Sequence, residues 1–142
     1  MTMTKKYKIL GKYIRDMSSE TADLETYIFV RDYIARYQLN IDINSKPLKN
    51  KLVEINTILK FEDKEDSKKK SYFEINYCTI IKVDDELKEK KDLEKIILCD
   101  VQVEIYNELE KSLLDLLHNS GYPAVKFEKK VDFEQLYKQR SN

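Results

Sequence analysis

Hydrophobic residues repeat at helical spacing between Ile96 and Tyr122, the clearest periodic stretch of the chain. Apolar side chains recur there every fourth position, at Ile97, Val101, Ile105, Leu109, Leu113 and Leu117. This spacing predicts a long amphipathic helix with one apolar face. Gly121 stands where a left-handed cap residue belongs and Pro123 prevents the helix from resuming, so we expect it to end near Ser120.

Four earlier segments alternate between apolar and polar residues, which is the period of a β-strand. They are residues 7–14, 37–43, 53–61 and 73–81. Turn residues follow the first segment at 16–19, and the charged run 62–70 predicts a long solvated loop between the third and fourth. Residues 27–37 fit neither period, and their dense aromatic side chains are hard to assign to a core.

Two shorter helices are expected from capping residues. Asp84 can cap a helix from about residue 85 to 91, and Asp132 can cap a last helix carrying Phe133, Leu136 and Tyr137. Four consecutive strands followed by helices predict an α+β fold, a four-stranded antiparallel sheet covered by a long C-terminal helix plus a short last helix. The length of 142 residues fits one domain, 1–142.

Strand 73–81 carries more apolar surface than one covering helix can bury. We therefore predict self-association, with contacts from the long helix and from Phe73, Ile75 and Tyr77. The alternative is that all three side chains lie in the monomer core.

Composition excludes a general electrostatic attraction to nucleic acid or anionic membrane, because Lys+Arg and Asp+Glu both total 26. The lysine run 68–70 follows several acidic residues and is interpreted as a solvated loop. Lysines interrupt every apolar run near the N-terminus, so neither a signal peptide nor membrane insertion is expected. The two cysteines, Cys78 and Cys99, then predict a cytoplasmic protein with buried, reduced thiols, a disulfide being the less favoured alternative.

Few residues are suited to catalysis or to metal binding. The single histidine, His118, lies near a helix end, where it complements the helix dipole. Neither cysteine has a CxxC partner, and two glycines cannot form a phosphate-binding loop. We therefore expect no catalytic residues, no metal and no cofactor, and rank binding above enzymatic activity.

The sequence resembles the SecB protein-export chaperones in four motifs that occur in the same order. Residues 13–20 (YIRDMSSE) resemble the family's first strand and turn, and 29–33 (FVRDY) its aromatic crossover segment. Residues 39–43 (LNIDI) match its second strand, and YP at 122–123 followed by VDFEQLY at 131–137 matches its C-terminal signature. The resemblance covers roughly residues 7–138.

This resemblance implies a homotetrameric chaperone, a dimer of dimers, that uses no ATP, holds unfolded precursor proteins and passes them to the SecA motor. It implies a client groove lined by Phe29, Tyr33, Ile41, Ile43, Leu136 and Tyr137, although ordinary core packing would equally explain Ile41 and Ile43. It places the SecA-docking surface at Asp16, Glu20, Tyr72 and Glu74.

The chain departs from the family pattern in three places, the first being a few residues inserted between Tyr33 and the second strand. The family's Phe-Pro-Tyr in the long helix reads Tyr106-Asn107-Glu108 here, without the proline that would kink the helix, and little of the acidic tail remains after the last helix. Two other functions stay open. One is a chaperone of the same fold dedicated to one client, such as the antitoxin of a toxin system, and the other is a small-molecule enzyme on a similar sheet.

Overall fold

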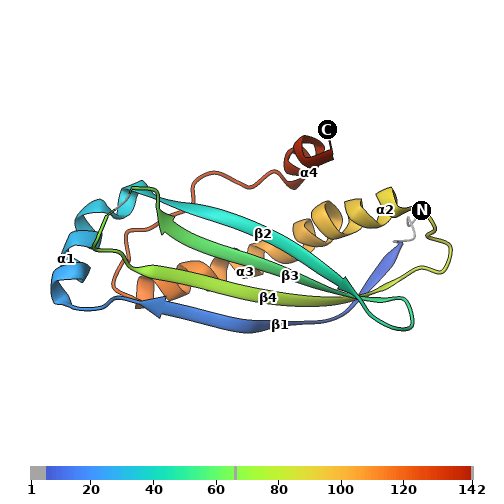
Figure 1. The fold of residues 1–142 in the computed structure, drawn as a ribbon, viewed down its shortest axis with the longest axis horizontal. Helices are drawn as coiled ribbons and strands as arrows, with labels where there is room; N and C mark the ends of the chain where they lie inside the picture. The colour runs from blue at the N-terminus through green and yellow to red at the C-terminus, as the bar shows by residue number, and fades with distance from the viewer. Residues whose placement is uncertain (1–5, 66, 142) are drawn as a thin grey trace.

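The computed structural model, which describes residues 6–65 and 67–141, shows an antiparallel sheet with a long helix lying across one face (Figure 1). The strands are β1 (Tyr7–Glu20), β2 (Tyr37–Pro47), β3 (Leu52–Asp63) and β4 (Tyr72–Val83). The helical elements are α1 (Leu24–Tyr33), the 3-10 turn Ile34–Arg36, α2 (Lys90–Lys95), the π-helical turn Ile96–Asp100, α3 (Val101–Asn119) and α4 (Phe133–Ser141). The predicted α+β class is confirmed.

The strands are ordered β1-β4-β3-β2, so β1 and β2 form the two edges of the sheet. Side chains alternate across it as the sequence pattern requires. Ile55 and Leu59 of β3 point toward α3 and are fully buried, whereas Glu54 and Lys60 point to the opposite side. We call the side that faces away from α3 the outer face.

The first strand is longer than its local sequence predicts. The turn expected at residues 16–19 is wrong, because β1 continues to Glu20, which pairs with Tyr72. Pairing with β4 supplies hydrogen bonds that a local turn cannot match, so tertiary context overrides the turn propensity. Two register shifts, between Ile9 and Gly11 and between Ile14 and Asp16, absorb the extra residues as β-bulges.

The segment that fitted neither period begins with helix α1. Asp23 is its N-cap, with a side-chain oxygen that accepts a 2.8 Å hydrogen bond from the Thr26 amide. This cap was the available sequence signal for the helix. Its apolar residues form no single stripe, because the helix packs across the end of the sheet and not along a face (Figure 1).

The predicted long helix is confirmed: α3 ends at Asn119 with Ser120 as its C-cap, as expected, and Gly121 follows with a φ of +105°. The short helix predicted at 85–91 is wrong: Asp84 accepts from the Glu86 amide in a turn, and α2 begins only at Lys90. In the first turn of α3, the side-chain amide of Gln102 donates through Nε2 to the Ile97 carbonyl at 3.1 Å. Its Oε1 accepts from the Thr57 hydroxyl at 2.9 Å. These buried bonds tie the π-helical turn to β3.

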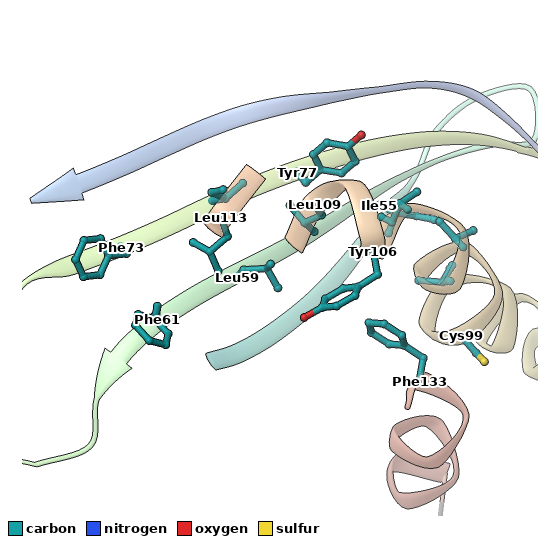
Figure 2. Close-up of a cluster of buried hydrophobic side chains, with 14 of the residues drawn as sticks. Ile55, Leu59, Phe61, Phe73, Tyr77, Cys99, Tyr106, Leu109, Leu113 and Phe133 are labelled. Atoms are coloured by element: carbon teal, nitrogen blue, oxygen red, sulfur yellow. The ribbon is translucent and has the colours of Figure 1, made fainter. Parts of the chain in front are cut away.

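The core lies between α3 and the sheet, as Figure 2 shows. Phe73, Ile75 and Tyr77 belong to it, with exposed fractions of 2%, 0% and 7% in the single chain. This corrects their assignment as contact residues for a second copy, because α3 of their own chain already covers them. Cys78 and Cys99 are buried free thiols, as predicted.

Candidate functional site

A pocket lies between edge strand β2 and the last helix. Ile41 and Ile43 of β2 line one side, and Leu136 and Tyr137 of α4 line the other. Leu98 and Phe133 complete the lining of this pocket of about 150 Å³. Four of the six residues predicted to bind a client therefore share one apolar pocket.

A wider pocket of about 590 Å³ continues along β2. It shares Ile41 and Leu136 with the first pocket and adds Leu39, Phe127 and further residues of the segment before α4. The two pockets are therefore parts of one depression, which we call the β2 groove: residues 39–43 on one side and 126–137 on the other.

Local interactions position α4 against the groove. Asp132 caps the helix as predicted, accepting a 3.0 Å hydrogen bond from the Gln135 amide. Phe133 is buried and packs edge-on against Tyr106 of α3, with ring centroids 5.1 Å apart (Figure 2). Leu136 remains 44% exposed on the groove side. Phe133 thus anchors the helix while Leu136 is left available for contact.

The other two predicted client residues lie outside the groove. Phe29 and Tyr33 stack on each other on α1 with centroids 4.6 Å apart, and neither lines the two pockets. The Arg36 guanidinium lies 4.5 Å from the Tyr33 ring centroid and 5.7 Å from that of Phe29. The stack therefore already has a cation–π partner from its own chain.

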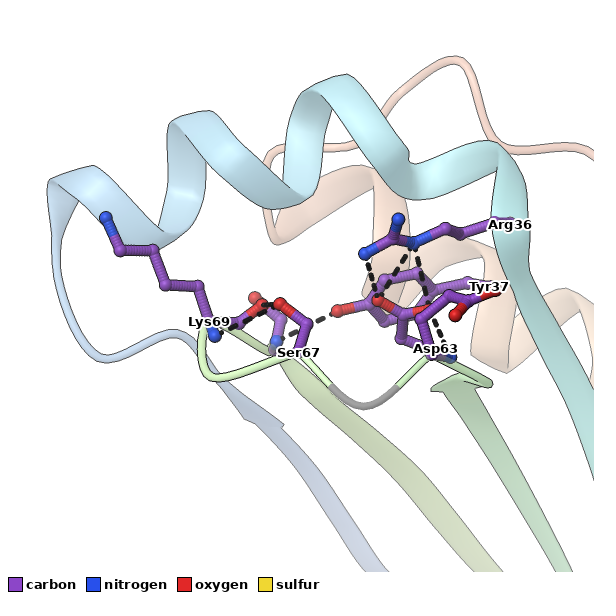
Figure 3. Close-up of polar contacts among 7 residues, drawn as sticks. Arg36, Tyr37, Asp63, Ser67 and Lys69 are labelled. Carbon is purple, nitrogen blue, oxygen red and sulfur yellow. Dashed lines mark hydrogen bonds and ion pairs between the residues drawn. The ribbon is translucent and has the colours of Figure 1, made fainter.

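Arg36 also joins this crossover to the sheet, as Figure 3 shows. Its Nε and Nη2 donate to both carboxylate oxygens of Asp63 at 3.0–3.1 Å. Burial acts to raise the pKa of Asp63, but the Glu65 amide and the Arg36 guanidinium outweigh it and hold that pKa below its usual range. The Tyr37 hydroxyl accepts from the Ser71 amide beside the pair. This network fixes the start of β2, and with it one end of the groove.

The residues predicted to dock SecA come together on the outer face. Asp16 pairs in register with Asn76, and Glu20 pairs with Tyr72, which is 59% exposed. Glu74 lies between these positions on β4 and forms a 3.5 Å ion pair with Lys60. The four residues thus form one patch of three carboxylates and one exposed ring, which we call the outer-face patch: Asp16, Glu20, Tyr72 and Glu74.

The single histidine has a structural partner. His118 bonds through Nε2 to the Val125 carbonyl at 2.9 Å, and so ties the end of α3 to the following loop. Within residues 6–65 and 67–141, no three His, Cys, Asp or Glu side chains are placed to hold a metal ion. None of the described helices is long and apolar enough to cross a membrane.

The sequence matches the family model for the preprotein translocase subunit SecB over residues 2–142. The chain belongs to the SecB family. A putative protein-export protein SecB from Pelagibacter ubique (strain HTCC1062) is 60% identical over 140 residues, covering 99% of this chain and 100% of that SecB protein. This chain is therefore a SecB-type chaperone for protein export.

A solved structure has the same fold. It is the Mycobacterium tuberculosis Rv1957 SecB-like chaperone in complex with a ChAD peptide from the Rv1956 HigA1 antitoxin. The TM-score is 0.61 at 10% sequence identity, covering 88% of this chain and 91% of that one. At this identity the likeness supports the SecB fold and nothing finer.

Proposed function

We propose that this SecB protein holds unfolded preprotein segments in the β2 groove. The observation that carries the proposal is the apolar groove beside an edge strand, with Leu39, Ile41 and Ile43 spaced two residues apart along it. A client strand can pair with the backbone of β2 and place alternate side chains over these residues. Backbone pairing and apolar contact tolerate many sequences, as a holding chaperone requires.

The comparisons support a chaperone for exported proteins over one dedicated to a single client. The 60% identical relative is a putative protein-export SecB. The M. tuberculosis protein, of the same fold, binds a peptide from an antitoxin, so this fold can hold a peptide. Client range separates the two functions, and we expect several unrelated unfolded proteins to be held with similar affinity.

Replacing Leu136 and Tyr137 together by serine is expected to weaken client binding about tenfold, because truncating central apolar contacts typically costs more than 1 kcal/mol. The measurement is the affinity for a permanently unfolded, fluorescently labelled preprotein. Melting should change little through Leu136, which is half-exposed, and modestly through Tyr137, which is partly buried against the core.

Leu24→Ser is the matched control, because Leu24 is 70% exposed on α1, away from the groove. Tyr33→Ser is tested separately and should affect stability more than affinity, given the Arg36 contact. Unchanged client affinity in a folded Leu136/Tyr137 variant would remove the groove from the proposal.

We propose further that the outer-face patch docks SecA. Asp16→Asn with Glu74→Gln should weaken SecA binding about fivefold and flatten its salt dependence, because exposed interfacial charges contribute modestly and are screened by salt. Client holding should stay intact, since the patch lies on the opposite side of the sheet from the core.

Lys60→Gln is the opposing control for the patch. Lys60 neutralises Glu74 at 3.5 Å, so its removal should strengthen SecA binding. If both variants bind SecA with wild-type affinity and salt slope, the docking surface lies elsewhere.

The homotetramer remains a proposal, with its contacts moved from the buried β4 residues to exposed apolar side chains. β1 is an edge strand whose Leu10, Ile14 and Met17 are 42–50% exposed, and Val103 of α3 is 59% exposed. A native mass near four times the 17.0 kDa chain is expected, and Met17→Lys with Val103→Lys should lower it without unfolding the protein. Ile75→Arg cannot serve as the test, because a charge at this fully buried position would unfold the monomer.

A further inference from the structure

One side of the β2 groove is positively charged. Lys126, Lys129 and Lys130 line the wider pocket together with Glu128, so that three positive charges stand against one negative charge. Opposite them, β2 contributes only Leu39, Asn40 and Ile41. The charge lies directly beside the apolar floor, where a bound segment would pass.

Among the residues that the structure describes, none forms an ion pair with these lysines. Each of the three is exposed. The acidic side chain nearest in sequence that does not line the pocket, Asp132, is engaged in capping α4. The residues that line the wider pocket therefore carry two more positive than negative charges.

We propose that the β2 groove selects extended segments in which an apolar core is flanked by Asp or Glu. The proposal rests on the groove being the client site, and it names the chemistry of the client. A strand paired with β2 would direct alternate side chains toward Leu39, Ile41 and Leu136. Its flanking residues would pass the lysines, where carboxylates are attracted and where lysine or arginine side chains are repelled.

The test uses two synthetic peptides of about nine residues with the same alternating apolar core, long enough to span the groove at about 3.3 Å per residue. One is flanked by aspartates and the other by lysines, and both carry the same fluorophore. We expect the aspartate-flanked peptide to bind about tenfold tighter at low salt, a difference that shrinks as salt screens the charges.

A triple variant, Lys126→Glu, Lys129→Glu and Lys130→Glu, should reverse this preference. The matched control changes Lys88, Lys90 and Lys91 to Glu; it alters the net charge equally at exposed positions away from the groove. Acidic residues in the first turn of α2 are favourable, so the control should fold. It should keep the wild-type preference for the aspartate-flanked peptide.

The outcomes separate this proposal from the one on which it rests. If both peptides bind equally, and both lose affinity in the Leu136/Tyr137 serine variant, the groove is the client site but the charge selection is wrong. Tighter binding of the lysine-flanked peptide likewise overturns the selection. If neither peptide binds wild-type protein, the groove and its selectivity fail together. If the triple variant keeps the preference for the aspartate-flanked peptide, the preference arises from charges other than these three lysines, and the proposal is wrong.

Discussion

Replacing Gly121 by alanine is expected to lower the free energy of unfolding by about 3 kcal/mol, from backbone strain and overpacking together. Gly121 ends α3 with a φ of +105°, a conformation that residues with a Cβ rarely adopt. A Cβ there would lie 2.6 Å from Cε1 of Tyr27. Urea unfolding of the variant measures the loss.

Gly11→Ala is the matched control, because a Cβ at Gly11 meets nothing within 4 Å and its φ is not positive. Alanine there should be neutral or slightly stabilising, since it reduces the entropy of the unfolded chain. Combining Gly121→Ala with Tyr27→Ala should relieve the clash but not the backbone strain. Equal stability of the Gly121 and Gly11 variants would show that α3 can end without the left-handed residue.

The turn at Gly121 has a consequence for the groove. The Tyr27 hydroxyl donates to the Gly121 carbonyl at 2.9 Å, and the Tyr122 amide donates to the Leu117 carbonyl at 3.0 Å. These bonds set the direction in which the chain leaves α3 to form residues 126–137, one side of the β2 groove (Figure 1). The Gly121 variant should therefore lose client affinity even at temperatures where it is still folded.

Elements with a strong period or a specific cap could be predicted from the sequence. Strands β2 to β4 follow from the alternation of apolar and polar residues, and α3 follows from apolar residues at every fourth position. The caps at Gly121 and Asp132 follow from residue chemistry. In each case the local signal and the tertiary environment agree.

The errors arise where long-range contacts decide. β1 continues through residues 16–19, which were expected to form a turn, because β4 pairs with them as far as Glu20. Helix α1 has no apolar stripe because it packs at the end of the sheet. The π-helical turn depends on Gln102 reaching Thr57, a contact between residues far apart in the sequence. The apolar excess on β4 suggested an interface because the sequence does not show how much surface α3 covers.

The candidate site was predicted in part for the same reason. Ile41, Ile43, Leu136 and Tyr137 meet because β2 and α4 are adjacent, which the family motifs imply. Phe29 and Tyr33 are aromatic, as the residues of such a groove often are, but the Arg36 guanidinium packs over both rings. The lysine-lined side was missed, because a loop with alternating charges gives no signal until its neighbour is known.

Replacing Arg36 by methionine is expected to lower the free energy of unfolding by about 2 kcal/mol at pH 7, by leaving the carboxylate of Asp63 without its main partner. The side chain of Asp63 is 1% exposed, whereas that of Arg36 is 33% exposed. Water near Arg36 moderates the loss, so it should be smaller than for a fully interior pair. Arg31→Met is the matched control, because the ion pair found for Arg31 among the described residues is an exposed 3.8 Å contact with Asp32.

The loss should depend on pH in a defined direction. In the wild type the folded-state pKa of Asp63 is lowered, so its stabilising contribution is present above the unfolded value of about 3.9 and is lost as the pH falls through the folded value. In the Arg36→Met variant burial remains without the guanidinium, which raises the folded pKa and makes the ionised carboxylate unfavourable. The stability gap between the two proteins should therefore be full at pH 7 and smaller at about pH 4, where Asp63 of the variant is becoming protonated. It should close only below the lowered wild-type pKa, where Asp63 is protonated in both proteins. Urea unfolding of wild type, Arg36→Met and Asp63→Asn at the two pH values measures this gap. Asp63→Asn has no carboxylate at this position, so residue 63 should not contribute to the pH dependence of its stability. A gap that is constant with pH would assign the cost of losing Arg36 to its contacts with Phe29 and Tyr33 instead of its ion pair.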